Sequence, residues 1–221
     1  MRLEAINTIT MKIAGLMPVI SDQDSMINPS WDQLCSISDH PLKYADNDYN
    51  PMWNDYGNRL VLLALATRKY CDWVLWLDDD ELIEPAIQHE KLHQCLRSEI
   101  KAAQERDCIA VSFQRCDMWD KTHWRSDGVW GQKRKVVLQR NPLTGDFVHW
   151  RGSHTQRLHA QPLQVGDIFD SPLKVFHFGW NSAEKRIAAK AKYARHDPGN
   201  VFQAQGYDYL ADESGIELTE V

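Results

Sequence analysis

The chain has 221 residues, and its 25 Lys and Arg against 31 Asp and Glu give a formal net charge of −6 at pH 7. That length suits one domain with a full hydrophobic core, and 43% hydrophobic with 25% charged residues is an ordinary composition for a folded protein. The acidic balance argues against a nucleic-acid-binding protein, and the apolar runs are far too short to form a transmembrane segment. With no secretory signal and with five cysteines in no disulfide or zinc spacing, we expect a cytoplasmic protein.

The first half of the chain predicts strands alternating with helices. We expect an N-terminal arm over residues 1–10, and a buried strand in the apolar run of residues 12–20. Residues 21–51 are rich in Asp, Asn, Ser and Pro, and they predict a long loop with one short helix and no second strand. Apolar side chains at helical spacing predict a helix over residues 51–69, and an apolar run bounded by acids predicts a buried parallel strand at residues 72–78.

The second half of the chain predicts one more helix and strand, at residues 84–106 and 108–113, and then mostly β-structure. The short strand-like segments in this part are residues 135–139, 147–150 and 174–178. The last predicted element is a basic helix over residues 182–195. We therefore expect an α/β fold with a mostly parallel central sheet, flanking helices and a smaller β-rich C-terminal part closed by a helix. Residues 11–200 would form this single domain, and residues 201–221 a C-terminal tail.

Four consecutive acids, Asp78 to Glu81, follow the predicted strand at residues 72–78. In open α/β sheets, ligands bind at the carboxyl ends of the strands. Side chains alternate along an extended segment, so Asp78 and Asp80 would point to one side and suit a hard cation such as Mg²⁺ or Mn²⁺. Adjacent carboxylates also repel one another unless a cation lies among them. The alternative interpretation is a solvated acidic turn that caps the next helix.

Residues 71–81 (CDWVLWLDDDE) resemble the D-x-D segment of family 2 glycosyltransferases, which have the GT-A fold. Four other stretches are also similar to the family. Residues 12–19 resemble its opening strand, and Asn58–Arg59 resembles the helix before the D-x-D strand. Residues 124–130 and 136–140 resemble the stretch behind the metal site, and residues 176–180, 184–186, Tyr193 and 197–198 resemble the closing strand and helix. The resemblance implies metal-dependent, inverting transfer of a sugar from a nucleotide-diphosphate sugar to a hydroxyl acceptor such as a glycan, a lipid-linked glycan or a cell-surface polysaccharide. Because the family's second strand is not evident, the resemblance implies a shortened nucleotide-binding half.

The resemblance also assigns the D-x-D carboxylates to a metal ion that bridges the donor's diphosphate. Asp80 would be a direct ligand, Asp78 would touch the metal or the donor's ribose, and His177 would be a third ligand. An imidazole ligand favours Mn²⁺ over Mg²⁺, whereas the alternative for His177 is a hydrogen-bonded histidine in a strand. Arg59 and Arg125 would lie on the donor side, and Arg125 could pair either with phosphate or with a neighbouring aspartate.

An inverting transferase needs a carboxylate that takes a proton from the acceptor hydroxyl. Asp127 is the first candidate for this base, because it lies in a Gly-containing turn beside Arg125 and Trp130. Asp117 and Asp120 are rival candidates. The alternative for Asp127 is an ordinary residue of an Asp-Gly turn.

The acceptor side would contain Trp124 and Trp130, because the apolar face of a sugar ring stacks on indole; the alternative is that they belong to the core. His154 could line the same side. The basic helix over residues 182–195 is either a solvated face or a contact with anionic lipid headgroups at a membrane surface.

The sequence is also compatible with two other functions. The first is a non-catalytic relative that serves as a carbohydrate-binding or scaffolding module. The second is a metal-dependent phosphoesterase that uses Asp78, Asp80 and His177. Sugar binding without nucleotide or metal would indicate the first, and release of phosphate would indicate the second.

Overall fold

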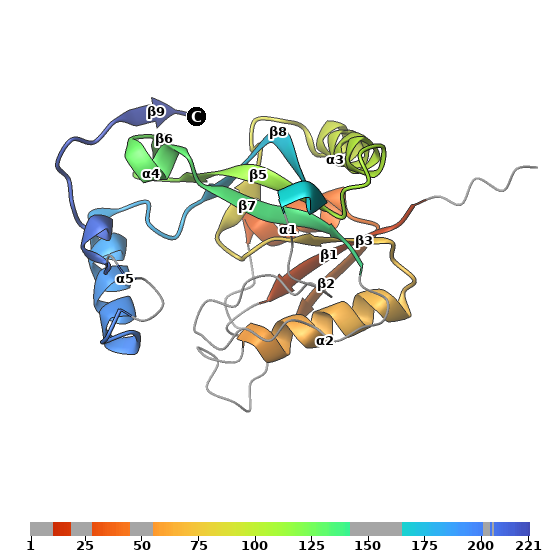
Figure 1. Ribbon diagram of the computed structural model, residues 1–221, viewed down its shortest axis with the longest axis horizontal. Coiled ribbons are helices and arrows are strands. Elements are labelled where there is room, and N and C mark those ends of the chain that lie inside the picture. Colours follow the sequence, from red (N-terminus) through yellow and green to blue (C-terminus); the bar gives the residue numbers. More distant parts are fainter. Residues whose placement is uncertain (1–10, 19–27, 45–54, 142–164, 201–203, 205) are drawn as a thin grey trace, which may run out of the picture.

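The computed structural model describes residues 11–18, 28–44, 55–141, 165–200, 204 and 206–221 (Figure 1). Its elements follow in chain order: β1 (Ile13–Pro18), α1 (Pro29–Ile37), β2 (His40–Tyr44), α2 (Asp55–Arg68), β3 (Trp73–Trp76), β4 (Glu81–Ile83), α3 (His89–Gln104), β5 (Ala110–Asp117), β6 (His123–Arg125), α4 (Gly128–Gly131), β7 (Arg134–Arg140), η2 (Val165–Asp167), β8 (Ile168–His177), α5 (Ala183–His196), η3 (Asp208–Leu210) and β9 (Leu218–Glu220). The expected N-terminal arm and the expected strand at residues 147–150 lie outside the described residues.

A seven-stranded sheet with the order β2-β1-β3-β7-β5-β8-β4 forms the centre of the described part of the chain. The strand pairs β1–β2, β1–β3 and β5–β8 are parallel. The pairs β3–β7, β5–β7 and β4–β8 are antiparallel. The protein therefore has the expected α/β class, but with a mixed sheet, because β7 returns between β3 and β5 without the crossover helix that a parallel pair requires.

Strand β2 corrects the expectation that no second strand precedes residue 51. It pairs in parallel with β1, from Ala14 opposite His40 to Pro18 opposite Tyr44. The strand was missed because it lies at the edge of the sheet, where all five of its residues are half-buried and no apolar run is needed. Helix α1 confirms the expected short helix, and the Asn28 side chain caps it by accepting hydrogen bonds from the first-turn amides.

Helices cover both faces of the β2-β1-β3 part of the sheet, which explains why β1 and β3 are apolar throughout (Figure 1). On one face, Ile13 and Met17 of β1 pack with side chains of α1 and α3. On the other face, Ala14 and Leu16 pack with α2. The chain runs from β1 through α1 to β2 on one side of β1, and then through α2 to β3 on the other side of β1. Helices α1 and α2 therefore lie on opposite faces of the sheet. The strand order therefore reverses its direction at β1.

Helix α3 is shorter than the expected helix over residues 84–106. Its start moves to His89, because the three-residue strand β4 and a turn that begins at Glu84 (φ 38°) occupy the preceding positions. The Gln33 side chain of α1 donates to the Ile83 carbonyl and accepts from the Ile83 amide, both at 2.7 Å. Gln33 thus satisfies backbone groups of β4 on the side of this edge strand that faces away from β8.

Among the described residues, the C-terminal half does not form a separate β-rich part, because β7 and β8 belong to the main sheet. In this described part, only β6 and β9 form a second sheet, of two strands. The segment after residue 206 packs against the rest of the protein: Tyr207 and Leu210 are buried, and they join three tryptophans and residues of α5 in one cluster. Within the described residues, no helix combines the length and the apolarity needed to cross a membrane.

Candidate functional site

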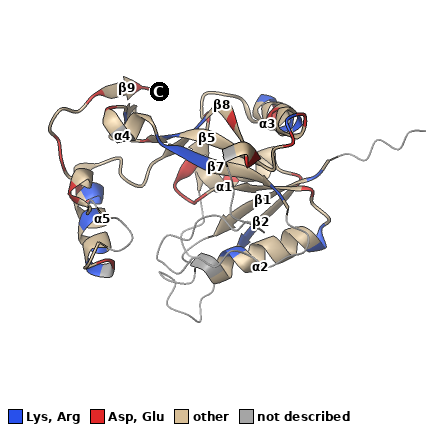
Figure 2. Ribbon diagram, in the orientation of Figure 1, with Lys and Arg blue, Asp and Glu red and all other residues tan. Residues whose placement is uncertain are grey.

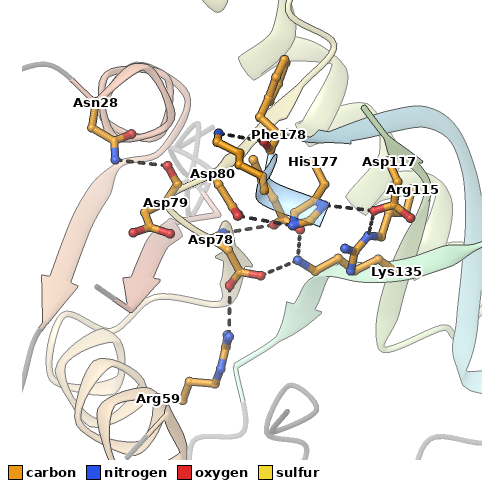
Figure 3. Close-up of polar contacts among 12 residues, drawn as sticks. Asn28, Arg59, Asp78, Asp79, Asp80, Arg115, Asp117, Lys135, His177 and Phe178 are labelled. Carbon is orange, nitrogen blue, oxygen red and sulfur yellow. Dashed lines mark hydrogen bonds and ion pairs between the residues drawn. The ribbon is translucent and has the colours of Figure 1, made fainter. Parts of the chain in front are cut away.

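The four acids after β3 form a tight turn rather than the expected extended segment. The Glu81 amide donates to the Asp78 carbonyl at 3.1 Å, and the Glu81 carboxylate accepts from the Asp78 amide at 3.0 Å. The turn leads into β4, whose residue Glu81 lies opposite His177 of β8. The Phe178 amide donates to the Asp80 carbonyl at 2.8 Å (Figure 3). Strand pairing, not side-chain alternation, therefore brings the acidic turn together with residues that lie far from it in the sequence.

Asp80 and His177 face each other across this junction, with 3.3 Å between Asp80 Oδ2 and His177 Nε2 (Figure 3). The Asp80 side chain is 41% exposed, whereas that of His177 is 10% exposed. Burial and the nearby Arg115 oppose a charged imidazole, but hydrogen bonding to Asp117 and Asp80 outweighs them and raises the pKa of His177 above its usual 6.5. Burial disfavours the Asp80 carboxylate, but the hydrogen bond with His177 outweighs it and lowers the pKa of Asp80.

Asp78 turns away from this pair toward two cations. Arg59 of α2 donates to its Oδ1 at 3.0 Å, and Lys135 of β7 donates to its Oδ2 at 2.6 Å. Lys135 also pairs with the fully buried carboxylate of Glu81. The protein's own Arg59 and Lys135 supply positive charge among these acids, so their repulsion does not by itself require a metal ion.

The three expected metal ligands consequently divide into a facing pair, Asp80 and His177, and one carboxylate, Asp78, that is held elsewhere. In the part of the chain that the structure describes, no group of three or more His, Cys, Asp or Glu side chains is arranged to hold a metal ion. Gly179 lies directly beside the pair, since a Cβ atom added there would be 2.5 Å from Asp80 Oδ2 and 2.7 Å from His177 Nε2.

Asp117 lies beneath His177 and holds three positively charged or polar partners. Arg115 Nε and Lys133 Nζ each donate to it at 2.8 Å, and His177 Nδ1 lies 3.0 Å from its Oδ1. The side chain is 1% exposed. Burial alone would favour the neutral acid, but the charge of Arg115 and the other partners hold the pKa of Asp117 far below its usual range.

Sequence reasoning named Asp117 only as a rival base and missed Arg115, Lys133 and Lys135 altogether. A signal for them exists in the charge pattern of the strands. Arg115 and Asp117 are two positions apart in β5, and Lys133 and Lys135 are two positions apart at the start of β7. Because side chains alternate along a strand, each pair lies on one face of the sheet, and opposite charges on neighbouring strands indicate a buried ionic network.

Asp127, the first candidate for the catalytic base, is bound by Arg125. Arg125 Nε donates to its Oδ1 at 2.7 Å and Nη2 to its Oδ2 at 3.0 Å, so Arg125 pairs with this aspartate, while its pairing with phosphate stays a prediction. These hydrogen bonds lower the pKa of Asp127, so the carboxylate is a weaker base. Arg125 lies over the ring of Trp130, Trp130 packs against Trp180, and Trp180 packs against His177. The structure thus pairs Asp127 with Arg125 and shows no direct contact between Asp127 and His177 within the described residues.

The two tryptophans expected on the acceptor side are buried. Trp130 is 2% exposed and packs edge-on against Trp119 and Trp180, with ring centroids 5.9 and 5.7 Å apart. Trp124 is 6% exposed and belongs to a cluster with Phe176 and other apolar side chains. Their placement corresponds to the alternative interpretation of both as core residues. His154 lies outside the described residues.

Helix α5 corresponds to the basic helix over residues 182–195, and Lys and Arg positions recur along it (Figure 2). Part of this positive charge is used within the protein. Arg186 is buried, donates to two backbone carbonyls and pairs with Glu213 at 3.2 Å. Lys190 pairs with Asp208 at 2.7 Å. Contact between the remaining exposed cations of this helix and a membrane surface stays a prediction.

Comparison with known proteins gives no functional assignment. No protein-family model and no curated protein matches the chain. Among solved structures, the chain is similar to the crystal structure of A197 from STIV, with a TM-score of 0.43 and 13% sequence identity. The match covers 76% of this chain and 86% of that one. A similarity this low carries neither fold family nor function, so the site must be interpreted from its own geometry.

Proposed function

We propose that the protein is a metal-dependent glycosyltransferase with a GT-A-like fold, which transfers a sugar from a nucleotide-diphosphate sugar to a hydroxyl acceptor. The observation that carries the proposal is the position of the Asp80–His177 pair, at the turn that follows β3. Strand β3 lies beside β1, where the strand order reverses and helices leave on opposite faces. In open α/β sheets, the carboxyl ends of strands at such a point form the ligand-binding crevice.

The presence of β2 gives further support. A parallel β2-β1-β3 unit with α1 and α2 on its two faces is the arrangement in which nucleotides bind in doubly wound folds. The N-terminal half is therefore less shortened than the sequence implied. The residues at the carboxyl end of β3 come close to those of β1, because the Leu77 amide donates to the Leu16 carbonyl at 3.1 Å. Asp78 is the next residue along the chain.

The side chains of Asp80 and His177 fit a divalent cation as two neighbouring ligands. Adjacent ligands of an octahedral ion at about 2.1 Å are about 3.0 Å apart, close to the observed 3.3 Å. The set of one carboxylate and one imidazole suits Mn²⁺ better than Mg²⁺. Water and the donor's phosphates would complete the shell, as is usual for such ions in sites with one or two protein carboxylates.

When bound, the metal would offset the negative charge that develops on the departing nucleotide diphosphate. The chain's own residues would organise the surroundings. Arg59 and Lys135 fix Asp78 and keep the turn in place, and the lack of a side chain at Gly179 allows its backbone to lie close to both Asp80 and His177.

Thermal melting with Mn²⁺ and a panel of UDP-, GDP- and dTDP-sugars tests the proposal. A donor present at about 100 times its dissociation constant should stabilise the protein by about 2.7 kcal/mol. Asp80→Asn should abolish the Mn²⁺-dependent part of this shift. Asp208→Asn changes an exposed aspartate outside the site, on η3, and should retain the shift. Absence of a shift with every donor in the presence of Mn²⁺ would contradict the proposal.

A non-catalytic carbohydrate-binding or scaffolding module is the second candidate. The observation that favours it is the pairing of Asp78 with Arg59 and Lys135, which leaves Asp80 as the only carboxylate of the D-x-D pair that faces His177. Glycan binding that is unchanged by EDTA and needs no nucleotide would support this candidate. Hydrolysis or transfer of a sugar from any nucleotide donor would exclude it.

A further inference from the structure

Two cations, Arg115 and Lys133, share one buried carboxylate beside the proposed site. Arg115 Nε donates to Asp117 Oδ1 at 2.8 Å (Figure 3), and Lys133 Nζ donates to Asp117 Oδ2 at the same distance. The Asp117 side chain is 1% exposed, whereas those of Arg115 and Lys133 are 24% and 28% exposed. Two cations against one carboxylate leave an excess of positive charge, and it is the cations that reach the solvent.

The outer part of the Arg115 guanidinium group is not used within the part of the chain that the structure describes. Only Nε donates a hydrogen bond, to Asp117. Nη1 and Nη2 donate to no described residue, and neither is one of the buried side-chain atoms that lack a partner, so both are in contact with solvent. The nearby carboxylate of Glu81 already pairs with Lys135. A planar fork of N–H groups in contact with solvent has the geometry that binds the oxygens of a carboxylate or phosphate.

Aromatic rings hold the two cations in place. Arg115 Cζ and Lys133 Nζ lie 5.2 and 5.3 Å from the centre of the Trp180 ring, and Lys133 Nζ lies 5.7 Å from that of Tyr209. Burial and the charge of Asp117 raise the pKa of Tyr209 to about 12, against the smaller effect of Arg115. The Tyr209 hydroxyl therefore remains protonated and adds a neutral donor to this group of residues.

We infer that Arg115 and Lys133 form an oxyanion site for an acidic sugar acceptor, and that they bind its carboxylate or phosphate group. The site lies beside the proposed metal ligands, because Asp117 Oδ1 is 3.0 Å from His177 Nδ1. It also lies away from the β1 and β3 ends where the nucleotide is proposed to bind, because β7 separates β5 from β3 in the sheet. Use of the oxyanion site by an acceptor rests on the proposed function, whereas binding of the oxyanion itself does not.

Titration of the metal-free wild-type protein with inorganic phosphate in EDTA tests the oxyanion site, with the ¹H–¹⁵N signal of Arg115 Nε as the readout. Arg115→Lys identifies this signal and keeps a cation beside Asp117. A saturable shift of the Arg115 signal supports the inference, and a signal that phosphate does not move overturns it. Calorimetry should show phosphate binding weakened about 10-fold or more in Arg115→Lys, the usual effect of losing a hydrogen bond between charged groups.

Arg106→Lys is the matched control, because Arg106 also lies over an aromatic ring, with 4.8 Å between its Cζ and the centre of the Phe169 ring, but outside the site. Its phosphate affinity should equal that of the wild type. Equal affinity in wild-type protein and in folded Arg115→Lys would overturn the assignment of the Arg115 fork. If Arg115→Lys does not fold, the signal of the wild-type protein decides alone.

The source of the oxyanion is tested with D-glucuronate and D-glucose 6-phosphate, each compared with neutral D-glucose. At least one of the two acidic sugars should shift the Arg115 signal, also in the presence of UDP, and glucose should not. A shift with UDP that replaces the effect of both acidic sugars would assign the oxyanion to the nucleotide and overturn the acceptor site.

These measurements separate the inference from the proposed function. Saturable phosphate binding at Arg115 in a protein that binds neither Mn²⁺ nor a nucleotide sugar supports the oxyanion site and contradicts the proposed function. An Arg115 signal that no oxyanion moves, in a protein that binds Mn²⁺ and a nucleotide sugar, overturns the oxyanion site and leaves the proposed function supported.

Discussion

Gly179→Ala is expected to separate Asp80 from His177 while leaving the fold intact. The added Cβ would lie 2.5 Å from Asp80 Oδ2, 2.7 Å from His177 Nε2 and 2.9 Å from His177 Cε1. Since non-bonded heavy atoms rest at about 3.5 Å, a displacement of about 0.8–1 Å is needed. His177 is held by Asp117 and Trp180, whereas the half-exposed side chain of Asp80 can rotate. We therefore expect Asp80 to move away from the ring.

Stability should fall moderately in this variant. Gly179 is not among the described glycines with positive φ, so its backbone conformation accepts alanine, and replacing glycine at such a position stabilises proteins by about 0.4–1 kcal/mol through the unfolded state. Rotation of Asp80 leaves the Cβ contacts with the His177 ring at 2.7 and 2.9 Å, and relieving such an overlap costs about 1–3 kcal/mol. Urea denaturation should therefore show a net loss of about 0–2.5 kcal/mol.

Metal binding should respond much more strongly. A misplacement of about 1 Å in a functional site can cost about 100-fold, so Mn²⁺ binding followed by water-proton relaxation should weaken by at least about 10-fold. Gly166→Ala is the matched control, because a Cβ at that position meets no atom within 4 Å. Unchanged Mn²⁺ affinity in Gly179→Ala would refute the assignment of Asp80 and His177 as joint ligands.

Three further predictions concern stability. Lys135→Met leaves the buried carboxylate of Glu81 without its ammonium partner, and it should lower the free energy of unfolding by about 3–5 kcal/mol in urea denaturation; Lys174→Met should change it much less. Gln33→Ala leaves both backbone groups of Ile83 without their side-chain partners and should cost about 2–4 kcal/mol in the same assay. Burial and the hydrogen-bonded carboxylate of Asp197 raise the pKa of Tyr207 from 10.0 to about 12. A group whose pKa is raised on folding contributes its full stabilisation below the pKa that it has in the unfolded chain, and this contribution is lost as pH rises through the folded pKa. The free energy of unfolding should therefore fall as pH rises from 10 toward 12. The Tyr207→Phe variant should lose stability less steeply over that range, and an equal slope would count against the assignment.

The strands that are buried on both faces were predictable from the sequence. β1 and β3 are apolar at every position because α1 and α3 cover one face and α2 the other. The missed strands of the main sheet lie at its two edges, and the two strands of the second sheet, β6 and β9, were missed as well. β2 is half-buried throughout, and β4 has only three residues, one of which is the charged Glu81. Neither strand carries an apolar pattern, because an edge strand has a neighbour on one side only.

The candidate site was predictable only where chemistry is local in the sequence. The acidic run indicated Asp80, and the resemblance to family 2 glycosyltransferases indicated His177. The lysine partners of the remaining acids depend on long-range strand pairing, since Lys135 reaches Asp78 because β7 lies beside β3, and Lys133 reaches Asp117 because β7 lies beside β5. Sequence spacing does not show which strands are neighbours, so neither lysine was assigned. Arg115, by contrast, lies two positions from Asp117 in the same strand, and this local signal was overlooked.

The distribution of charge in the site has a consequence for how it would bind its ligands. Asp78 and Glu81 are neutralised by Arg59 and Lys135, and Asp117 by its own cations. Asp80 is then the carboxylate whose partner is a titratable histidine rather than a permanent cation. A divalent ion held by one such carboxylate and one neutral imidazole retains half of its positive charge. On the proposed function, that charge would be satisfied by the diphosphate of the donor, so the metal and the donor should each strengthen the binding of the other by the same factor.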